Sequence, residues 1–155
     1  MRKHKIYLAS SWRNEEQQAL VKTLRYLGHE VYDFKNPKEG DVGFSWKQVG
    51  YDNDFIANGD VTQNHITTYL EALKKPRAIE GFNSDNDAMN WATMFVLLLP
   101  CGRSAHLEAG WAAGAGKETH VILSTKKFEP ELMYLLCDKI HPNIEAFLEV
   151  AKVTK

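Results

Sequence analysis

The sequence lacks an excess of charge of either sign. Its 155 residues include 19 lysines and arginines against 20 aspartates and glutamates, which gives a formal net charge of -1. Surfaces that hold duplex nucleic acid or an anionic membrane carry a clear excess of positive charge. We therefore expect neither polymeric nucleic acid nor a membrane as a partner, and any ligand related to nucleic acids should be small.

Cysteine and long hydrophobic runs are also scarce. Cys101 and Cys137 are too few and too far apart for a disulfide framework, and neither belongs to a CxxC pair of the kind that binds zinc. The longest apolar run, residues 94–99, is far shorter than the roughly 18 residues that cross a bilayer. The six histidines show no HExxH or paired spacing, so we expect no metal site. These features favour a soluble protein of the reducing cytoplasm.

The chain does contain enough apolar material for one continuous core. Hydrophobic residues make up 44% of the sequence and aromatic residues 11%. A chain of this length lies in the size range of one globular domain. We therefore expect a single domain that spans residues 1–155, without internal repeats or low-complexity stretches.

The pattern of residues 5–34 predicts a strand, a helix and a second strand. Residues 5–10 form a short apolar run, and from Asn14, a good N-cap, apolar residues recur at helical spacing until Gly28. Residues 29–34 alternate as a strand does. Two strands joined by a helix of this length imply a parallel unit with a right-handed crossover.

The rest of the chain continues this alternation after a long loop. Residues 35–60 are rich in glycine and predict a loop with up to one turn of helix, and loops of that length are usually functional. Residues 94–100 suit a central strand covered on both faces. The other expected elements are helices at 63–74, 79–91 and 105–115, a strand at 120–124, and short helices near 129–136 and 143–150. The fold class is α/β, a single doubly wound, mostly parallel sheet of Rossmann or flavodoxin type with helices on both faces.

Polar residues follow the first predicted strand. Segments beyond the carboxyl ends of parallel strands converge on one crevice. Ser10, Ser11 and Arg13 offer two hydroxyls and a guanidinium beside the N–H groups of a helix start, which together suit a phosphate or carboxylate. A capped turn with Arg13 in solvent explains the same residues equally well.

A second polar group follows the central strand, in CGRSAHLEAG, residues 101–110. Glu108 falls about one turn into a helix of mainly small residues, where its carboxylate can act as a nucleophile. A solvated helix glutamate is the alternative. Arg103, Ser104 and His106 crowd the same turn with polar groups that a structural helix would not need, and this favours a site.

A third group precedes the central strand. Asp87 and Asn90 lie three residues apart on one helix face, with Trp91 one turn after Asp87. A carboxylate beside an amide and an aromatic ring could bind and protonate a base. Taken by itself, the segment is better explained as a helix N-terminus rich in aspartate, which the helix dipole favours.

Three segments occur in a fixed order: KIYLASSWRNEEQ, DNDAMNWATMFVLLLP and GRSAHLEAGWAAGAGK. Together they resemble the nucleoside 2-deoxyribosyltransferase family, which includes the 2'-deoxynucleoside 5'-phosphate N-hydrolases and the CMP N-glycosidases. The resemblance implies cleavage of an N-glycosidic bond without a cofactor. It implies Glu108 as the nucleophile, Asp87 as the acid at the base, and Tyr7 as the residue that orients the nucleophile.

The resemblance also bears on the substrate. Ser10, Ser11 and Arg13 match the phosphate positions of the family in kind, with Ser104 as a further candidate and Asn90 beside the base. The transferases carry an acidic residue near the position of Arg103 and Ser104, which here suit an anion. This favours a small-molecule nucleotide, a nucleoside 5'-monophosphate, over a nucleoside, while the base, the sugar and the choice between hydrolase and transferase stay open.

Other interpretations remain at this point. The chain could be a nucleotide-binding sensor without turnover, or an NAD glycohydrolase that uses Glu108 on another N-ribosyl bond. Members of the family are oligomers with shared active sites, so we expect a homodimer or higher homo-oligomer. Apolar residues such as Trp111, Met133 and Leu136 would then lie at an interface, although they could equally fill the core.

Overall fold

The structure, a computed structural model, describes residues 2–51 and 59–152. The chain divides into two compact units. The first, which we call the sheet unit, comprises Met1–Phe34 and Ala88–Lys155, and the second, which we call the insert unit, comprises Lys35–Asp87. The boundary falls inside helix α4 (Pro76–Trp91).

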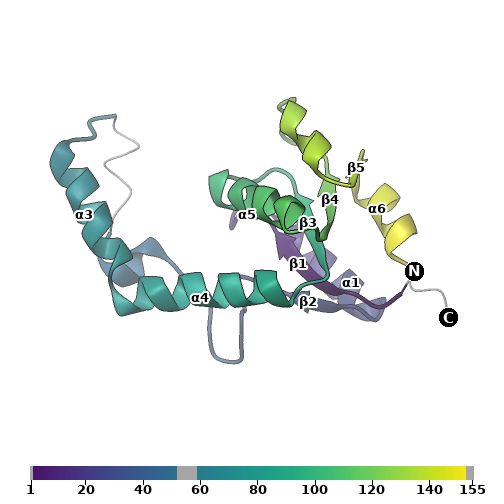
Figure 1. The fold of residues 1–155 in the computed structure, drawn as a ribbon, viewed down its shortest axis with the longest axis horizontal. Helices are drawn as coiled ribbons and strands as arrows, with labels where there is room; N and C mark the ends of the chain where they lie inside the picture. The colour runs from purple at the N-terminus through teal and green to yellow at the C-terminus, as the bar shows by residue number, and fades with distance from the viewer. Residues whose placement is uncertain (1, 52–58, 153–155) are drawn as a thin grey trace. The chain divides into compact units, whose positions relative to one another are not determined.

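The sheet unit contains five parallel strands in the order β2-β1-β3-β4-β5 (Figure 1). The chain runs from β1 outward to β2 and then returns to the other side of β1 to form β3, so the strand order reverses between β1 and β3. This confirms the predicted α/β fold with a doubly wound sheet. The strands are β1 (Lys5–Ala9), β2 (Glu30–Tyr32), β3 (Met94–Leu98), β4 (Glu118–Ile122) and β5 (Lys139–His141).

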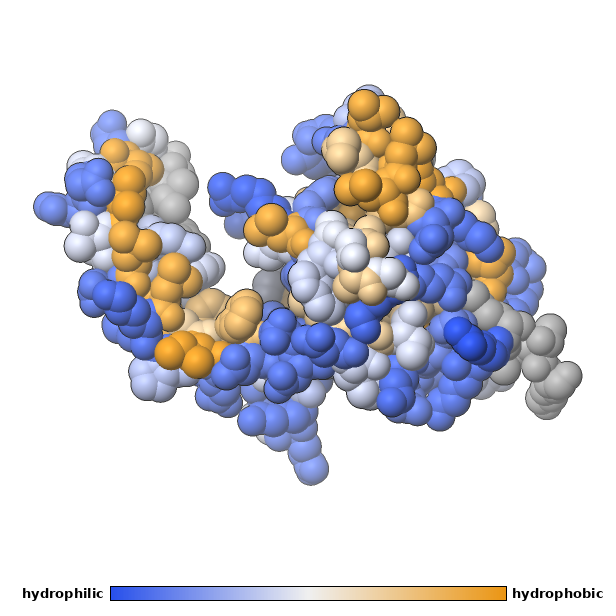
Figure 2. All heavy atoms as spheres, viewed as in Figure 1, coloured by the Kyte–Doolittle hydropathy of each residue, from blue (hydrophilic) through white to orange (hydrophobic). Residues whose placement is uncertain are grey.

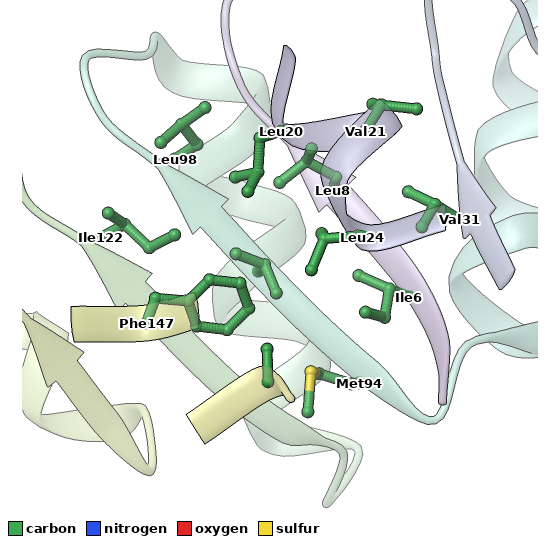
Figure 3. Packing of buried hydrophobic residues seen from close by; sticks show 12 residues of the cluster. Ile6, Leu8, Leu20, Val21, Leu24, Val31, Met94, Leu98, Ile122 and Phe147 are labelled. Atoms are coloured by element: carbon green, nitrogen blue, oxygen red, sulfur yellow. The ribbon is translucent and has the colours of Figure 1, made fainter. Parts of the chain in front are cut away.

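Helices cover both faces of the sheet because side chains of the central strand β3 alternate between two apolar clusters. Met94, Val96 and Leu98 pack with residues of α1 (Gln17–Tyr26) and α6 (Ile144–Ala151). Figure 3 shows Met94 and Leu98 in this cluster. Phe95 and Leu97 pack on the other face, against α5 (Arg103–Gly114) and the end of α4. All five residues of β3 are buried, which explains why its sequence is apolar without alternation.

The insert unit has a small aromatic core of its own. Val49, Tyr51 and Ala72 are buried there, with Phe44 and Trp46 packed against them. The predicted turn of helix within residues 35–60 is a 3-10 helix, η1 (Trp46–Val49), and the helix predicted at 63–74 is α3 (Gln63–Leu73).

Arg77 and Gly81 hold the start of α4 against the rest of the insert unit. The guanidinium of Arg77 donates hydrogen bonds to the Asp41 carboxylate at 3.1 Å and to the Gly43 carbonyl at 2.9 Å. Gly81 lies so close to Phe44 that a Cβ atom at this position would be 2.9 Å from the Phe44 Cβ atom. The absence of a side chain at Gly81 therefore allows this contact.

Several element boundaries differ from the predictions. Helix α1 begins at Gln17 because the Asn14 side chain accepts a hydrogen bond from the Glu16 amide, which makes a turn before the helix instead of a cap. Strand β5 was not predicted. The helix predicted near 129–136 is a 3-10 helix, η2 (Leu132–Leu136).

Asp87 lies near the end of a helix and not at its start. Helix α4 begins at Pro76, which is well suited to the first turn of a helix, three residues before the predicted start. Asp87 therefore falls in the last turns of α4, and the explanation of the aspartates as a helix N-terminus is wrong.

Among residues 2–51 and 59–152, no helix combines the length and apolar character needed to cross a membrane.

Candidate active site

A cavity of about 500 Å³ lies at the carboxyl ends of the central strands, where the strand order reverses. The segments that follow β1, β3 and β4 all contribute to its wall, as expected for a ligand site of a doubly wound sheet. The lining residues with polar side chains are Ser11, Arg13, Asn14, Cys101, His106, Lys127, Glu129, Glu131 and Tyr134.

The segment after β1 is tied to the segment after β3. The Asn14 side-chain amide donates a hydrogen bond to the Pro100 carbonyl at 3.3 Å, and the Ser11 hydroxyl accepts one from the Arg13 amide at 3.1 Å. These contacts hold the turn that presents Ser11 and Arg13 to the cavity. The Ser10 hydroxyl instead donates to the Leu98 carbonyl at 2.9 Å and joins the ends of β1 and β3.

His106 and Tyr134 form one wall of the cavity. His106 Nδ1 lies 2.7 Å from the Gly102 carbonyl oxygen, which can only accept, so this nitrogen carries a proton. His106 Nε2 lies 2.9 Å from the Tyr134 hydroxyl. The two rings also stack, with centroids 5.7 Å apart. This pair connects η2 to the first turns of α5.

The Cys101 thiol in the cavity wall stays protonated. Burial, and next the negative charge of Glu108, raise the pKa of the Cys101 thiol to about 12. Because a thiolate and not a thiol is the nucleophile, Cys101 is a poor candidate for covalent chemistry near neutral pH.

Glu108 lies in the second turn of α5, next to this wall. Its side chain is half-buried, one of its carboxylate oxygens is out of contact with solvent, and its charge acts on Cys101. The small residues Ala105, Ala109 and Ala112 are buried against the sheet and fix this helix close to it. Their size allows Glu108 to approach the cavity wall.

Tyr7 is fully enclosed in β1, with 1% of its surface exposed. Its ring stacks on Tyr32 in β2 at 5.2 Å and on Phe95 in β3 at 5.3 Å. Tyr7 packs in the same apolar cluster as Ala105, Ala109 and Ala112, the small residues of α5 on either side of Glu108 in the sequence.

The other predicted site residues lie elsewhere. Arg103 and Ser104 are exposed in the first turn of α5 and do not line the cavity. Asn90 is exposed near the end of α4, where its carbonyl accepts a hydrogen bond from Lys117 at 2.9 Å. Asp87 belongs to the insert unit and borders an open hollow of about 470 Å³ there. The structure thus brings Ser11 and Arg13 together in one cavity, with Glu108 beside its wall.

Comparisons with known proteins give distant structural likenesses. No family model matches the chain, and no curated protein matches it. Among solved structures it is similar to the CMP N-glycosidase BcmB of Clostridium botulinum, with 16% sequence identity, a TM-score of 0.49, and coverage of 96% of this chain and 98% of that chain.

Sequence reasoning missed four polar residues of the cavity, Lys127, Glu129, Glu131 and Tyr134. Lys127 follows β4 and Tyr134 lies in η2, and both line the cavity. Ser11 was placed in the crevice because it follows the carboxyl end of a strand. The same rule would also have selected Lys127, which follows β4. Tyr134 was not predicted as a site residue, because its neighbours in η2 are apolar and the segment was interpreted as an apolar surface or core.

Within residues 2–51 and 59–152, no group of three His, Cys, Asp or Glu side chains is placed to hold a metal ion.

Proposed function

We propose that the protein cleaves the N-glycosidic bond of a nucleoside 5'-monophosphate or nucleoside, with Glu108 as the nucleophile. The observation that carries the proposal is the position of Glu108 beside the wall of a cavity at the switch point of the sheet, where its charge acts on the cavity residue Cys101. The resemblance of the three sequence segments to the nucleoside 2-deoxyribosyltransferase family supports the same role.

In the proposed reaction the Glu108 carboxylate attacks the anomeric carbon. The bond from this carbon to the base nitrogen breaks, and its electron pair leaves with the base, which takes up a proton. Water, or a second base, then displaces the carboxylate from the sugar. This two-step course resembles that of a retaining glycosidase.

Two further residues have supporting roles in the proposal. Asp87 would give the proton to the departing base, and Tyr7 would orient Glu108. A positioned acid of this kind contributes roughly 10²–10⁴ in rate. The proposed reaction needs no cofactor, because Glu108 supplies the nucleophile and Asp87 supplies the proton for the departing base.

Arg13 and Ser11 support a phosphorylated substrate. Both line the cavity, and a guanidinium beside a hydroxyl suits a phosphate group. In the proposal Ser10, Arg103, Ser104 and Asn90, which do not line the cavity, remain candidates for substrate binding.

The proposal is tested with a panel of nucleoside 5'-monophosphates and their nucleosides, with free base measured by chromatography. We expect base release from at least one monophosphate. NAD is included, because release of nicotinamide would identify an NAD glycohydrolase instead. Nucleotide binding without any base release would indicate a sensor and would overturn the proposal.

A further inference from the structure

We infer that His106 and Tyr134 act as a proton-linked pair that strengthens binding of a dianion in the 500 Å³ cavity. The inference rests on the anion-binding part of the proposed function. It does not require the glycosidic bond to be cleaved at this site.

The present hydrogen bonds leave Tyr134 poorly suited to an anion. Because the Gly102 carbonyl holds a proton on His106 Nδ1, the Nε2 atom of the neutral ring has a lone pair and accepts the Tyr134 hydroxyl. The single hydrogen of Tyr134 is then used by His106. The oxygen of Tyr134, a residue of the cavity wall, then has only lone pairs left, which repel anionic oxygens.

Addition of one proton to His106 reverses this bond. The Nε2 atom becomes a donor while the Nδ1 proton stays on the Gly102 carbonyl, so the Tyr134 oxygen becomes the acceptor. The hydroxyl hydrogen is released to donate to an anionic oxygen in the cavity. The balance is one proton taken from solvent, and no other bond is made or broken. Since binding and protonation favour each other, each should strengthen the other by the same factor.

The surroundings of Tyr134 keep its hydroxyl group protonated. Burial is the largest cause that raises the pKa of Tyr134 above its usual range, and the negative charges of Glu131 and Glu129 raise it further. Tyr134 therefore remains a hydroxyl near neutral pH.

Other charged groups face the pair from each neighbouring segment. Arg13 comes from the segment after β1, and Lys127, Glu129 and Glu131 come from the segment after β4. On the side of α5, Glu108 acts on Cys101, whose sulfur lies 3.7 Å from His106 Nδ1. Two cations and two carboxylates line the cavity itself, so a bound dianion adds negative charge that a proton on His106 offsets.

Sulfate is the probe, because it stays a dianion while histidine titrates and any proton uptake must come from the protein. Isothermal titration calorimetry in two buffers of different ionisation enthalpy gives the number of protons taken up on binding. We expect net proton uptake, and sulfate affinity that rises about tenfold between about pH 8 and about pH 6.

Two variants and one control distinguish the proposed reversal of the His106–Tyr134 hydrogen bond from a link between sulfate binding and proton uptake that rests on charge attraction alone. Tyr134→Phe keeps the stacked ring and removes the hydroxyl, so the affinity gained at low pH and most of the proton uptake should be lost. His106→Gln cannot titrate, so proton uptake should disappear. Tyr26→Phe, at a tyrosine of α1 that is 90% exposed, is the matched control and should behave as the wild type.

The outcomes are distinct. Equal proton uptake in Tyr134→Phe and the wild type would mean that charge attraction alone links the two events, and would overturn the inference. Sulfate binding that does not vary with pH, or no sulfate binding, would overturn it as well. Because the measurement involves no turnover, the pair can be established even if no nucleotide is cleaved, and it can fail even if one is.

Discussion

His120 Nδ1 lies 2.8 Å from His141 Nε2, and the two rings stack with centroids 5.1 Å apart and an interplanar angle of 6°. Both side chains are buried, and Phe147 of α6 packs on the edge of each ring. The Glu118 carboxylate accepts a hydrogen bond from His120 Nε2 at 3.0 Å. The pair thus joins β4 to β5 inside the core.

This buried pair predicts that acid destabilises the sheet unit. Burial is the main cause that lowers the pKa of His141, followed by the charges of His120 and Lys139, and burial is also the main cause that lowers the pKa of His4. The unfolded chain therefore binds protons more readily than the folded protein, so stability rises with pH between the lowered folded values and the unfolded value of about 6.5. We expect a lower melting temperature at about pH 5.5 than at about pH 7.5.

The His141→Gln variant provides the comparison. Glutamine can form a hydrogen bond with His120 but does not titrate, so the fall in melting temperature between these pH values should be smaller than in the wild type. A melting temperature that rises as the pH is lowered would contradict the lowered pKa values of His141 and His4.

Gly81→Ala should destabilise the insert unit. The added Cβ atom would lie 2.9 Å from the Phe44 Cβ atom, which is close to the backbone and cannot move aside cheaply. Overpacking of this kind costs about 1–3 kcal/mol. Gly110→Ala in α5 is the control, because no heavy atom lies within 4 Å of the new Cβ there. That variant should be as stable as the wild type or more so by roughly 0.5–1 kcal/mol. Denaturant unfolding measures both, and equal stabilities would show that the Phe44 contact is unimportant.

Arg13→Ala should narrow the preference for monophosphates over nucleosides. A charge-assisted hydrogen bond is worth about 1.5–3 kcal/mol, so kcat/KM for the monophosphate should fall roughly tenfold or more while that for the nucleoside changes little. Lys22→Ala, at an exposed cation of α1, serves as the control. If nucleosides are the better substrates of the wild type, the anion pocket is wrongly assigned.

The apolar residues of η2 predict self-association. Leu132, Met133, Leu135 and Leu136 are between 57% and 75% exposed, and Figure 2 shows an orange patch over the segment between β4 and β5. Exposed apolar patches on this scale commonly mark interfaces. We expect a homodimer or higher homo-oligomer by light scattering, with Leu135→Glu shifting it toward the monomer. A mass near 17.7 kDa that persists at high concentration would contradict this expectation.

The sequence predicted the sheet better than the site. Strand β3 was recognisable because its five residues are all buried, which requires a continuous apolar run. Strand β5 was not recognisable, because it has three residues, of which only Ile140 is hydrophobic. It lies at the edge of the sheet and pairs with β4 alone. The start of α1 was misplaced because asparagine caps helices and makes turns with the same side-chain oxygen.

The site depends on contacts that no local pattern records. Ser11 and Arg13 could be placed in the crevice from their position after β1, which is a rule of topology. The pairing of His106 with Tyr134 joins residues 28 positions apart and needs the path of the chain after β4. Asp87 shows the limit of local patterns: the aspartates at residues 85 and 87 suggested the start of a helix, but Asp87 is the twelfth of the 16 residues of α4.

Glu108→Ala tests the central claim most directly. Alanine is favourable in a helix, so the fold should remain, and the thermal melt of the variant should match that of Glu149→Ala, a control at an exposed glutamate of α6. Release of free base from the best nucleoside 5'-monophosphate should fall roughly 10³-fold or more in Glu108→Ala and stay at the wild-type level in the control. Base release at the wild-type rate by a folded Glu108→Ala protein would contradict the account.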